Sequence, residues 1–420
     1  MLSVDEALGK ILNCIDILEA EDRPLLGSLG QIAAEDVHAE IDVPSRDSSA
    51  RDGFAVRARD IQGASPGNPR ILPVIETVMA GFASKRGLSP GTAIRIMTGA
   101  PMPPGADCVV SFEDTGEMTA VGKKRPAKRV SILKAEKKGA NIKRSGEQVA
   151  RGSLILSRGA AIGPVELNLL ASQGYTRVKA IRRPLVAIID TGQELANPGR
   201  QLRLPQIYNG NGLSIAALVQ RCGGTAWILG IAKDTKRSIS AKIRRGTRAD
   251  AIVTTGGVSS GDRDLVKDLL AEMGQIMVRQ VRMVPGKAFT FALIPGTGPS
   301  GSARQIPHFA LSGNPPAAMV NFEILARPAL LKMQGATGLA PRTLEAVMEE
   351  SLVNDEALRR FAWVIVEQRQ GCYYARQPDS KAGGTLGSMA SADGLAVIPE
   401  DVALVKKGEK LRVILLDWHH

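Results

Sequence analysis

Short apolar, β-branched runs alternate with helix-like stretches between residues 183 and 334. The clearest unit is the run 251–255, which ends in Gly256 and Gly257. After a small-residue loop it continues into apolar positions spaced as on one face of a helix. A similar unit starts from the apolar run 185–189. Because strands that alternate with helices build parallel sheets, this pattern predicts a doubly wound α/β domain over residues 183–334.

The flanking regions have different periodicities. Residues 1–42 look mainly helical and, with 150–182, predict a helical or mixed domain, in which a helix near 164–174 rejoins the N-terminal helix. Residues 43–149 contain short β-like runs between Gly/Pro turns, which predict a β-rich domain inserted into the first. Residues 335–420 favour a small β-barrel or sandwich. The expected fold class is therefore α/β plus β, in several domains.

Polar and glycine-rich segments follow the expected strands of the α/β domain. They are Thr191–Glu194, Asp234, Gly256–Asp264 and Ser312–Pro315. In open α/β sheets, ligands bind beyond the carboxyl ends of the strands, so these segments are expected to converge on one site. A strand, a glycine turn and a helix start together present backbone N–H groups, which suits an anionic small molecule. The alternative is that such turns only connect the elements.

The net charge of +12 indicates an anionic partner or a basic surface. Much of the excess lies between Lys123 and Arg144, where Glu136 is the only acidic residue. This run could be a solvated face or could guide an anionic ligand. The run has no interleaved aromatic residues to stack bases, which argues against nucleic-acid binding.

Cysteine and histidine usage narrows the chemistry. The four cysteines form no CxxC pair, and two of the four histidines are terminal, so zinc sites and His-based triads are not indicated. Any metal is expected to be oxygen-ligated. No apolar run approaches the length of a membrane span. Because Asp5, Glu6 and Lys10 interrupt the N-terminal stretch, no signal peptide is indicated, and we expect a cytoplasmic location.

Seven motifs, taken in order and spacing, resemble one family. They are Asp52–Val56, Arg95–Pro101 with Pro104–Asp107, Asn141–Glu147, Thr191–Leu195, Thr254–Ser259, Pro285–Lys287 and Gly313–Pro315. This set resembles the molybdenum-cofactor enzymes of the MoeA type, which include the E domains of gephyrin and of its plant counterpart. The resemblance covers nearly the whole chain.

The resemblance implies an elongated homodimer of four domains per chain, including a MogA-like α/β domain that binds molybdopterin. The active site is expected between that domain and the partner subunit. The implied reaction takes adenylylated molybdopterin and molybdate as substrates, inserts molybdenum and releases AMP, with Mg²⁺ as cofactor. A MogA-like adenylyltransferase or a client molybdoenzyme would be a further partner.

The resemblance and the residue chemistry together select candidate site residues. The catalytic candidates are Asp52, Asp264 and Lys287. Candidates for ligand binding are Thr98, Arg144, Glu194, Asp234, Gly256, Gly257, Ser259, Gly313 and Asn314. Asp52, Glu194 and Asp264 are the candidate Mg²⁺ ligands. Each has a structural alternative, since Asp52, Thr98 and Asn314 would shape turns and Asp234 or Asp264 would suit a helix start. His308 is expected to lie at a strand edge without a role.

The chain departs from the family where lysine, serine and arginine resemble molybdate ligands. Val284 replaces the lysine, Ala317 replaces the serine and, by a looser alignment, Trp363 replaces the arginine. Ala288, where the family has proline, is a further departure in the same loop as Val284. Losing one charge-assisted hydrogen bond costs about 1.5–3 kcal/mol. The sequence therefore indicates pterin binding more firmly than molybdate insertion. The alternative function is a carrier or assembly paralogue that binds molybdopterin or the finished cofactor without inserting metal.

Overall fold

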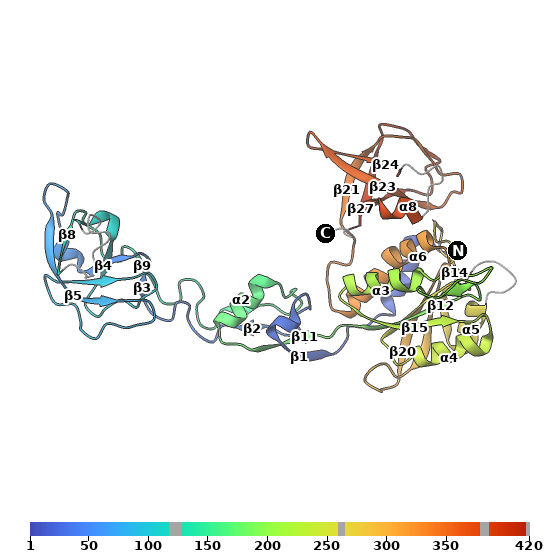
Figure 1. Ribbon diagram of the computed structural model, residues 1–420, viewed down its shortest axis with the longest axis horizontal. Coiled ribbons are helices and arrows are strands. Elements are labelled where there is room, and N and C mark those ends of the chain that lie inside the picture. The colour runs from blue at the N-terminus through green and yellow to red at the C-terminus, as the bar shows by residue number, and fades with distance from the viewer. Residues whose placement is uncertain (117–127, 259–264, 379–385, 417–420) are drawn as a thin grey trace.

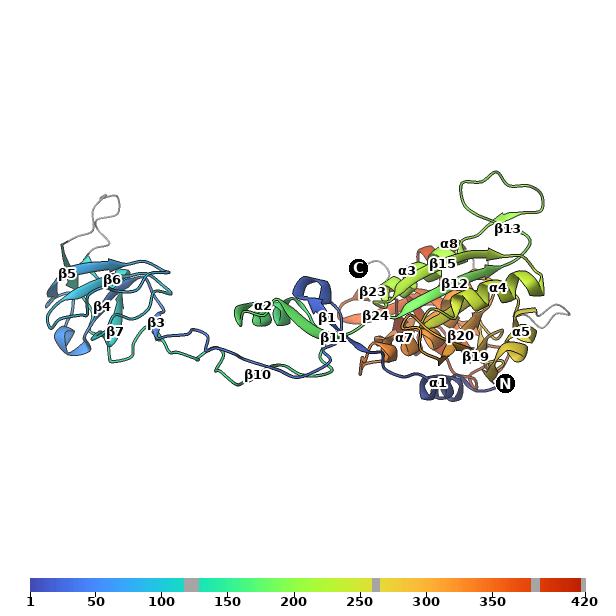
Figure 2. The same cartoon turned by 90° about the horizontal axis from the view of Figure 1, so that it is seen from below.

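A computed structural model describes residues 1–116, 128–258, 265–378 and 386–416. The chain is elongated (Figure 1). The β-rich inserted domain lies at one end, a small linking region lies in the middle, and the α/β domain and C-terminal barrel lie together at the other end (Figures 1 and 2). Among the described residues, no helix combines the length and apolar character needed to cross a bilayer.

The α/β domain is built on a six-stranded sheet in the order β15-β12-β16-β20-β19-β17. The parallel strands are β15 (Thr225–Ala232), β12 (Leu185–Thr191), β16 (Ala251–Thr255) and β20 (Arg304–Leu311). Next to them, β19 (Thr290–Gly296) runs antiparallel to β20, and the edge strand β17 (Gln275–Val278) runs antiparallel to β19. The sheet is thus mixed, which corrects the expectation of a wholly parallel sheet. The short β19–β20 connection allows an antiparallel pair without a crossover helix.

Helices cover both faces of this sheet because successive strand residues point to opposite sides. Val186 and Ile188 of β12 share a core with α3 (Asn211–Arg221). Ala187 and Ile189 of the same strand face α4 (Lys236–Gly246) and α5 (Leu265–Met273). The strands are buried on both faces, which explains their continuous apolar sequences. The doubly wound expectation is confirmed.

The last helix of the domain runs without interruption through three segments. It runs as α6 (Pro315–Asn321), a π-helical segment (Phe322–Ala326) and α7 (Arg327–Met333). Pro328 lies in the first turn of α7. The π-helical segment just before it accommodates the proline, so the chain changes its winding there instead of ending the helix.

The N-terminal region corrects the sequence-based expectation. Helix α1 (Val4–Asn13) forms, but the mainly helical prediction is wrong for the residues that follow it. They contain β1 (Ala20–Pro24), a 3₁₀ turn (Leu25–Ser28) and β2 (Val37–His38). The apolar stripe of α1 is buried in the α/β core, so the helix does not rejoin the later segment. Strand β1 does so, by pairing with β11 (Arg177–Ile181).

The linking region also contains β10 (Leu154–Leu156), paired with β2, and α2 (Pro164–Ser172). Beyond it, the inserted domain has a five-stranded sheet in the order β7-β4-β6-β5-β8. Its strands are β4 (Gly53–Val56), β5 (Arg70–Val78), β6 (Ala93–Ile96), β7 (Cys108–Ser111) and β8 (Arg129–Ile132). A short pair, β3 (Ser48–Ser49) and β9 (Ile142–Lys143), closes its base.

The C-terminal region is a closed barrel, which decides between the barrel and sandwich alternatives. Its strands are β21 (Thr343–Met348), β23 (Arg359–Arg369), β24 (Cys372–Arg376), β25 (Gly394–Ile398) and β27 (Lys410–Leu415). Pairing of β23 with both β24 and β25 completes the ring. A strand of the α/β domain, β18 (Met283–Val284), pairs with β23 and fixes the barrel beside that domain.

A buried ion-pair network holds the sheet to the linking region at the end opposite the strand tips. Asp250 is fully buried and accepts two hydrogen bonds from Arg182, at 2.6 and 2.7 Å. Arg304 adds a third contact of 3.2 Å, and the amide of Leu185 a fourth of 2.8 Å. This fourfold pairing compensates for burial of the carboxylate.

His308 lies inside the sheet, so the expectation of a strand-edge position is wrong. It sits on β20 between Ile252 of β16 and Ala292 of β19, and its Nε2 lies 3.0 Å from the hydroxyl of Thr254. Burial lowers the pKa of His308 to about 3, because the imidazolium would lose its hydration there.

This burial predicts a specific pH dependence of stability. Below about pH 6.5 the unfolded chain protonates His308, whereas the folded chain does not until about pH 3. Stability is therefore fully present above pH 6.5 and falls as the pH drops through that window. Between pH 7 and 5 we expect the free energy of unfolding to fall by about 2 kcal/mol more than in His308→Gln. Urea unfolding followed by tryptophan fluorescence tests this, and equal losses would contradict it.

Candidate functional site

A cavity of about 610 Å³ lies at the carboxyl ends of the parallel strands. Its walls come from the loops after β12, β15, β16 and β20, together with the start of α3. The lining residues are Thr191–Leu195, Ile207, Asn211, Asp234, Thr255–Val258, Leu265, Ala288 and Ser312–Asn314. The loop tips that the sequence singled out as one site therefore meet in one cavity.

The turn after β16 requires glycine at both positions. Gly256 and Gly257 have φ angles of +85° and +69°, which side chains rarely adopt. A Cβ on Gly256 would lie 2.8 Å from the carbonyl oxygen of Thr191, and one on Gly257 would lie 2.6 Å from a methyl of Val266. The loop after β20 also approaches this turn, since a Cβ on Gly313 would lie 3.3 Å from the Cα of Gly256.

Not every amide of these loops can serve a ligand. The N–H of Gly256 donates to the carbonyl oxygen of Leu311 at 3.1 Å, so it is already used. The N–H groups of Gly257 and Gly313 have no acceptor among the residues that the structure describes. Two cavity-lining residues from different loops therefore have amides available to a ligand, which suits an oxyanion.

A buried polar network that the sequence analysis missed supports the cavity floor. Asp190, at the end of β12, is fully buried and accepts hydrogen bonds from the hydroxyl of Thr255 at 2.6 Å and the amide of Asn209 at 2.7 Å. Asn211 donates to the carbonyl oxygen of Gly313 at 2.9 Å. The available signal was an acidic residue directly after a wholly apolar strand. This carboxylate joins the ends of β12 and β16 to the segment before α3, beneath the site.

Two exposed carboxylates, Glu194 and Asp234, line the cavity. Asp234 accepts a hydrogen bond from the amide of Gln193 at 3.0 Å, which fixes it at the rim. The candidates Ser259 and Asp264 lie outside the described residues. Within the described part of the chain, no group of three or more His, Cys, Asp or Glu side chains could hold a metal.

The candidates of the inserted domain do not reach this cavity within one chain. Asp52 accepts hydrogen bonds from the amide and hydroxyl of Thr98, at 2.7 and 2.8 Å, and these bonds hold the pKa of Asp52 below its usual range. Arg144 pairs with Asp47 at 2.5 Å. All lie in the inserted domain, at the opposite end of the molecule from the α/β domain (Figure 2).

The basic run is partly neutralised where the structure describes it. Lys134 pairs with Asp114 at 3.2 Å and with Glu136 at 3.0 Å. Asp114 and Asp47, the partner of Arg144, both lie outside the run 123–144 in sequence. Acidic residues from outside the run therefore oppose its charge, in addition to Glu136. Lys123 and its nearest basic neighbours lie outside the described residues.

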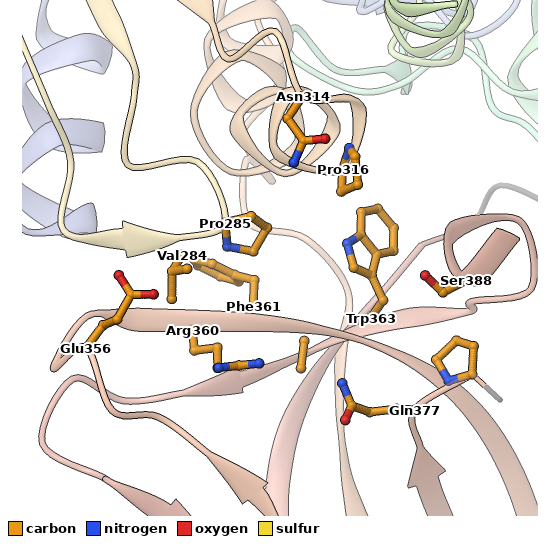
Figure 3. Close-up of a pocket in the computed structure, with 12 residues that line it drawn as sticks. Val284, Pro285, Asn314, Pro316, Glu356, Arg360, Phe361, Trp363, Gln377 and Ser388 are labelled. Carbon is orange, nitrogen blue, oxygen red and sulfur yellow. The ribbon is translucent and has the colours of Figure 1, made fainter. Parts of the chain in front are cut away.

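A smaller cavity of about 260 Å³ separates the α/β domain from the barrel (Figure 3). Val284 and Trp363, two of the departures from the family pattern, both line it, and Trp363 extends from β23 toward Pro316. Asn314 lines both cavities, so the two adjoin. Half-buried Arg360 is the one cation among its described lining residues.

The three remaining sequence candidates, Lys287, Ala317 and Ala288, have different surroundings. Lys287 is exposed and does not belong to the described lining of either cavity. Ala317 is buried at the start of α6, with 5% of its surface exposed. Ala288 lines the larger cavity.

Comparisons with known proteins agree along the whole chain. Family models match in chain order: the MoeA N-terminal region (domain I and II) at residues 2–174, a "Probable molybdopterin binding domain" at 187–332, and the MoeA C-terminal region (domain IV) at 345–416.

Curated relatives and solved structures match over similar lengths. The chain is 36% identical over 398 residues to a protein of Mycobacterium tuberculosis named molybdopterin molybdenumtransferase 2, covering 93% of each. It is 33% identical to the molybdopterin molybdenumtransferase of Bacillus subtilis, covering 99% of this chain and 94% of that protein. The crystal structure of a MoeA protein from Pyrococcus horikoshii superposes with a TM-score of 0.81 at 32% identity, over 99% of both chains. The chain therefore belongs to the MoeA family.

Proposed function

We propose that the protein acts in molybdenum cofactor biosynthesis, where it inserts molybdenum from molybdate into adenylylated molybdopterin and releases AMP. The observation that carries the proposal is the cavity of about 610 Å³, which combines two carboxylates with loop amides that have no acceptor in the described part of the chain. Relatives that match nearly the whole chain are named molybdopterin molybdenumtransferase. An anionic pterin with a phosphate ester suits such a cavity.

The residues of the cavity have separate tasks in this proposal. The amides of Gly257 and Gly313 bind the phosphate of the pterin, because two N–H donors from different loops fix one oxyanion in position. Asn211 orients the second of these loops through its bond to Gly313. Asp190 acts beneath the ligand as a positioning residue, since it ties the ends of β12 and β16 together.

Mg²⁺ fits the donor set in part. Glu194 and Asp234 are exposed to one cavity, and Mg²⁺ is commonly held by one or two carboxylates together with water and substrate phosphate. Glu194 would hold the ion, with Asp264 as a further ligand. Bound there, Mg²⁺ would neutralise charge on the phosphoanhydride of the substrate.

Asp52, Thr98 and Arg144 join this site only if a second chain supplies them. In one chain they lie at the far end of the molecule from the cavity (Figure 1). The proposed homodimer would bring the inserted domain of one subunit to the α/β domain of the other, with Asp52 kept ionised by Thr98.

A second candidate function rests on the smaller cavity. Val284 and Trp363 offer it apolar surface where charged donors would bind a dianion, and Arg360 is its one described cation. A protein with this cavity could hold the pterin ligand without inserting metal, and would then act as a carrier or assembly factor.

The first test of the proposal supplies adenylylated molybdopterin, Mg²⁺ and molybdate to the purified protein. We expect AMP release that depends on molybdate and stops when the metal is removed with a chelator. Release is measured by chromatography of the nucleotide. Tight retention of the adenylylated pterin with no AMP release would instead identify a carrier.

A second test concerns the glycine turn. Gly257→Ala places a methyl group against Val266 and strains a left-handed residue, so we expect molybdopterin affinity to fall at least about tenfold. Gly371→Ala is the matched control, because Gly371 has a φ of +81° in the β23–β24 hairpin but an added Cβ meets no atom within 4 Å. Isothermal titration calorimetry gives both affinities. Equal affinities in the two variants would show that the turn does not hold the ligand.

A third test restores donors at the altered positions. If Val284 and Ala317 weaken molybdate binding, the variant Val284→Lys/Ala317→Ser should bind molybdate at least about tenfold more tightly, since each added charge-assisted bond contributes about 1.5–3 kcal/mol. Val353→Lys, at an exposed position of the C-terminal region, controls for the added charge. The same affinity in both variants would mean that these departures do not limit molybdate binding.

A further inference from the structure

A second, larger cavity opens beside the proposed pterin cavity, with a volume of about 900 Å³. Four segments line it: residues 192–196 after β12, the loop 197–206, the end of β15 and the residues just before α4. The loop connects β13 (Leu195–Ala196) to β14 (Ile207–Tyr208) and stands away from the body of the domain (Figure 2). The two cavities share Gly192, Gln193 and Leu195, so they form one continuous depression.

Three cations from two separate elements line this second cavity. Arg200 and Arg203 belong to the loop, and Lys233 follows β15. All three are exposed, and none forms an ion pair with a carboxylate among the described residues. The other polar side chains of the lining are Gln193, Asn197, Gln201, Gln206 and Thr235. The described lining thus offers positive charge and hydrogen-bond donors, with no acidic residue.

Charge is divided between the two cavities. Glu194 and Asp234 line the pterin cavity, whereas the second cavity has only cations. Gln193 lies at the boundary between the two cavities, because it lines both of them. Its backbone amide donates a hydrogen bond of 3.0 Å to Asp234. Arg200 and Arg203 come from the loop and Lys233 follows β15, yet all three line one concave surface. Such convergence favours an oxyanion ligand.

We propose that this second cavity is a subsite for a tetrahedral oxyanion, held by Arg200, Arg203 and Lys233 beside the pterin ligand. Two sources have this chemistry in the proposed reaction: the phosphate of the nucleotide half of the substrate, and free molybdate. The assignment of these sources rests on the proposed function, whereas the binding of an oxyanion by the three cations does not. Arginine suits either anion because its fork of N–H donors matches two oxygens at once.

The test compares two double variants with the same change in charge. Arg200→Gln/Arg203→Gln removes both loop cations, and Arg221→Gln/Arg248→Gln removes two exposed arginines of the same domain that line no described cavity. Isothermal titration calorimetry is performed with AMP, with molybdate and with molybdopterin. In the loop variant we expect the affinity for AMP or molybdate to fall about tenfold or more. The control should stay within about twofold of the parent, and so should molybdopterin affinity in both variants.

The outcomes separate the sources and the two proposals. A loss for AMP alone assigns the subsite to the nucleotide phosphate, and a loss for molybdate alone assigns it to the free oxyanion; either supports the subsite. Equal losses in the two variants, no loss in either, or no binding of AMP and molybdate by the parent protein would overturn it. If the parent does not bind molybdopterin but the loop variant still loses AMP or molybdate, the proposed function fails while the subsite stands.

Discussion

The close approach of three loops at the strand tips is the constraint on which the rest of the site depends. Gly256 lies against both Thr191 and Gly313, so the ends of β12, β16 and β20 meet with no room for a side chain between them. Asp190 beneath them accepts hydrogen bonds from Thr255 and Asn209, which tie the end of β12 to the end of β16 and to the segment before α3. A buried carboxylate tolerates no loss of these partners, because an unpaired buried charge is costly. The same interactions that stabilise the sheet end therefore also shape the cavity.

The elongated form of the chain places the cavity far from the inserted domain (Figure 1). Its open side has loop amides, two carboxylates and, in the adjoining cavity, three cations. The motif residues around Asp52 lie in a domain of their own, far along the molecule (Figure 1). A site that uses both sets needs two chains, which gives a physical reason for a long linking region of paired strands. At the other end of the sheet, the fourfold pairing of Asp250 anchors that region to the α/β domain.

Much of the fold could be predicted from the sequence, because buried parallel strands and amphipathic helices leave strong local patterns. The run 251–255 and the helix after it are examples, as are the glycines of the turn between them. Elements stabilised by distant partners were harder to predict. Strand β1 has the sequence Ala-Glu-Asp-Arg-Pro and pairs only because β11 lies beside it. The antiparallel direction of β19 and the central position of His308 likewise depend on strand order, which no local pattern encodes.

The candidate site shows the same division. Glycines and acids at strand ends were visible as motifs, and the structure brings Glu194, Asp234, Gly256 and Asn314 to one cavity. Asp190 was missed because its role depends on Thr255 and Asn209, which reach it from other loops. The hydrogen bond from the Gly256 amide to Leu311 was also invisible in the sequence, and it leaves that amide unavailable to a ligand.

The most direct measurement is a crystal structure of the protein with bound molybdopterin. The account predicts that the phosphate of the pterin lies within hydrogen-bonding distance of the Gly257 amide, between the loops that follow β16 and β20. A pterin bound elsewhere, with that turn facing only protein or water, would contradict it.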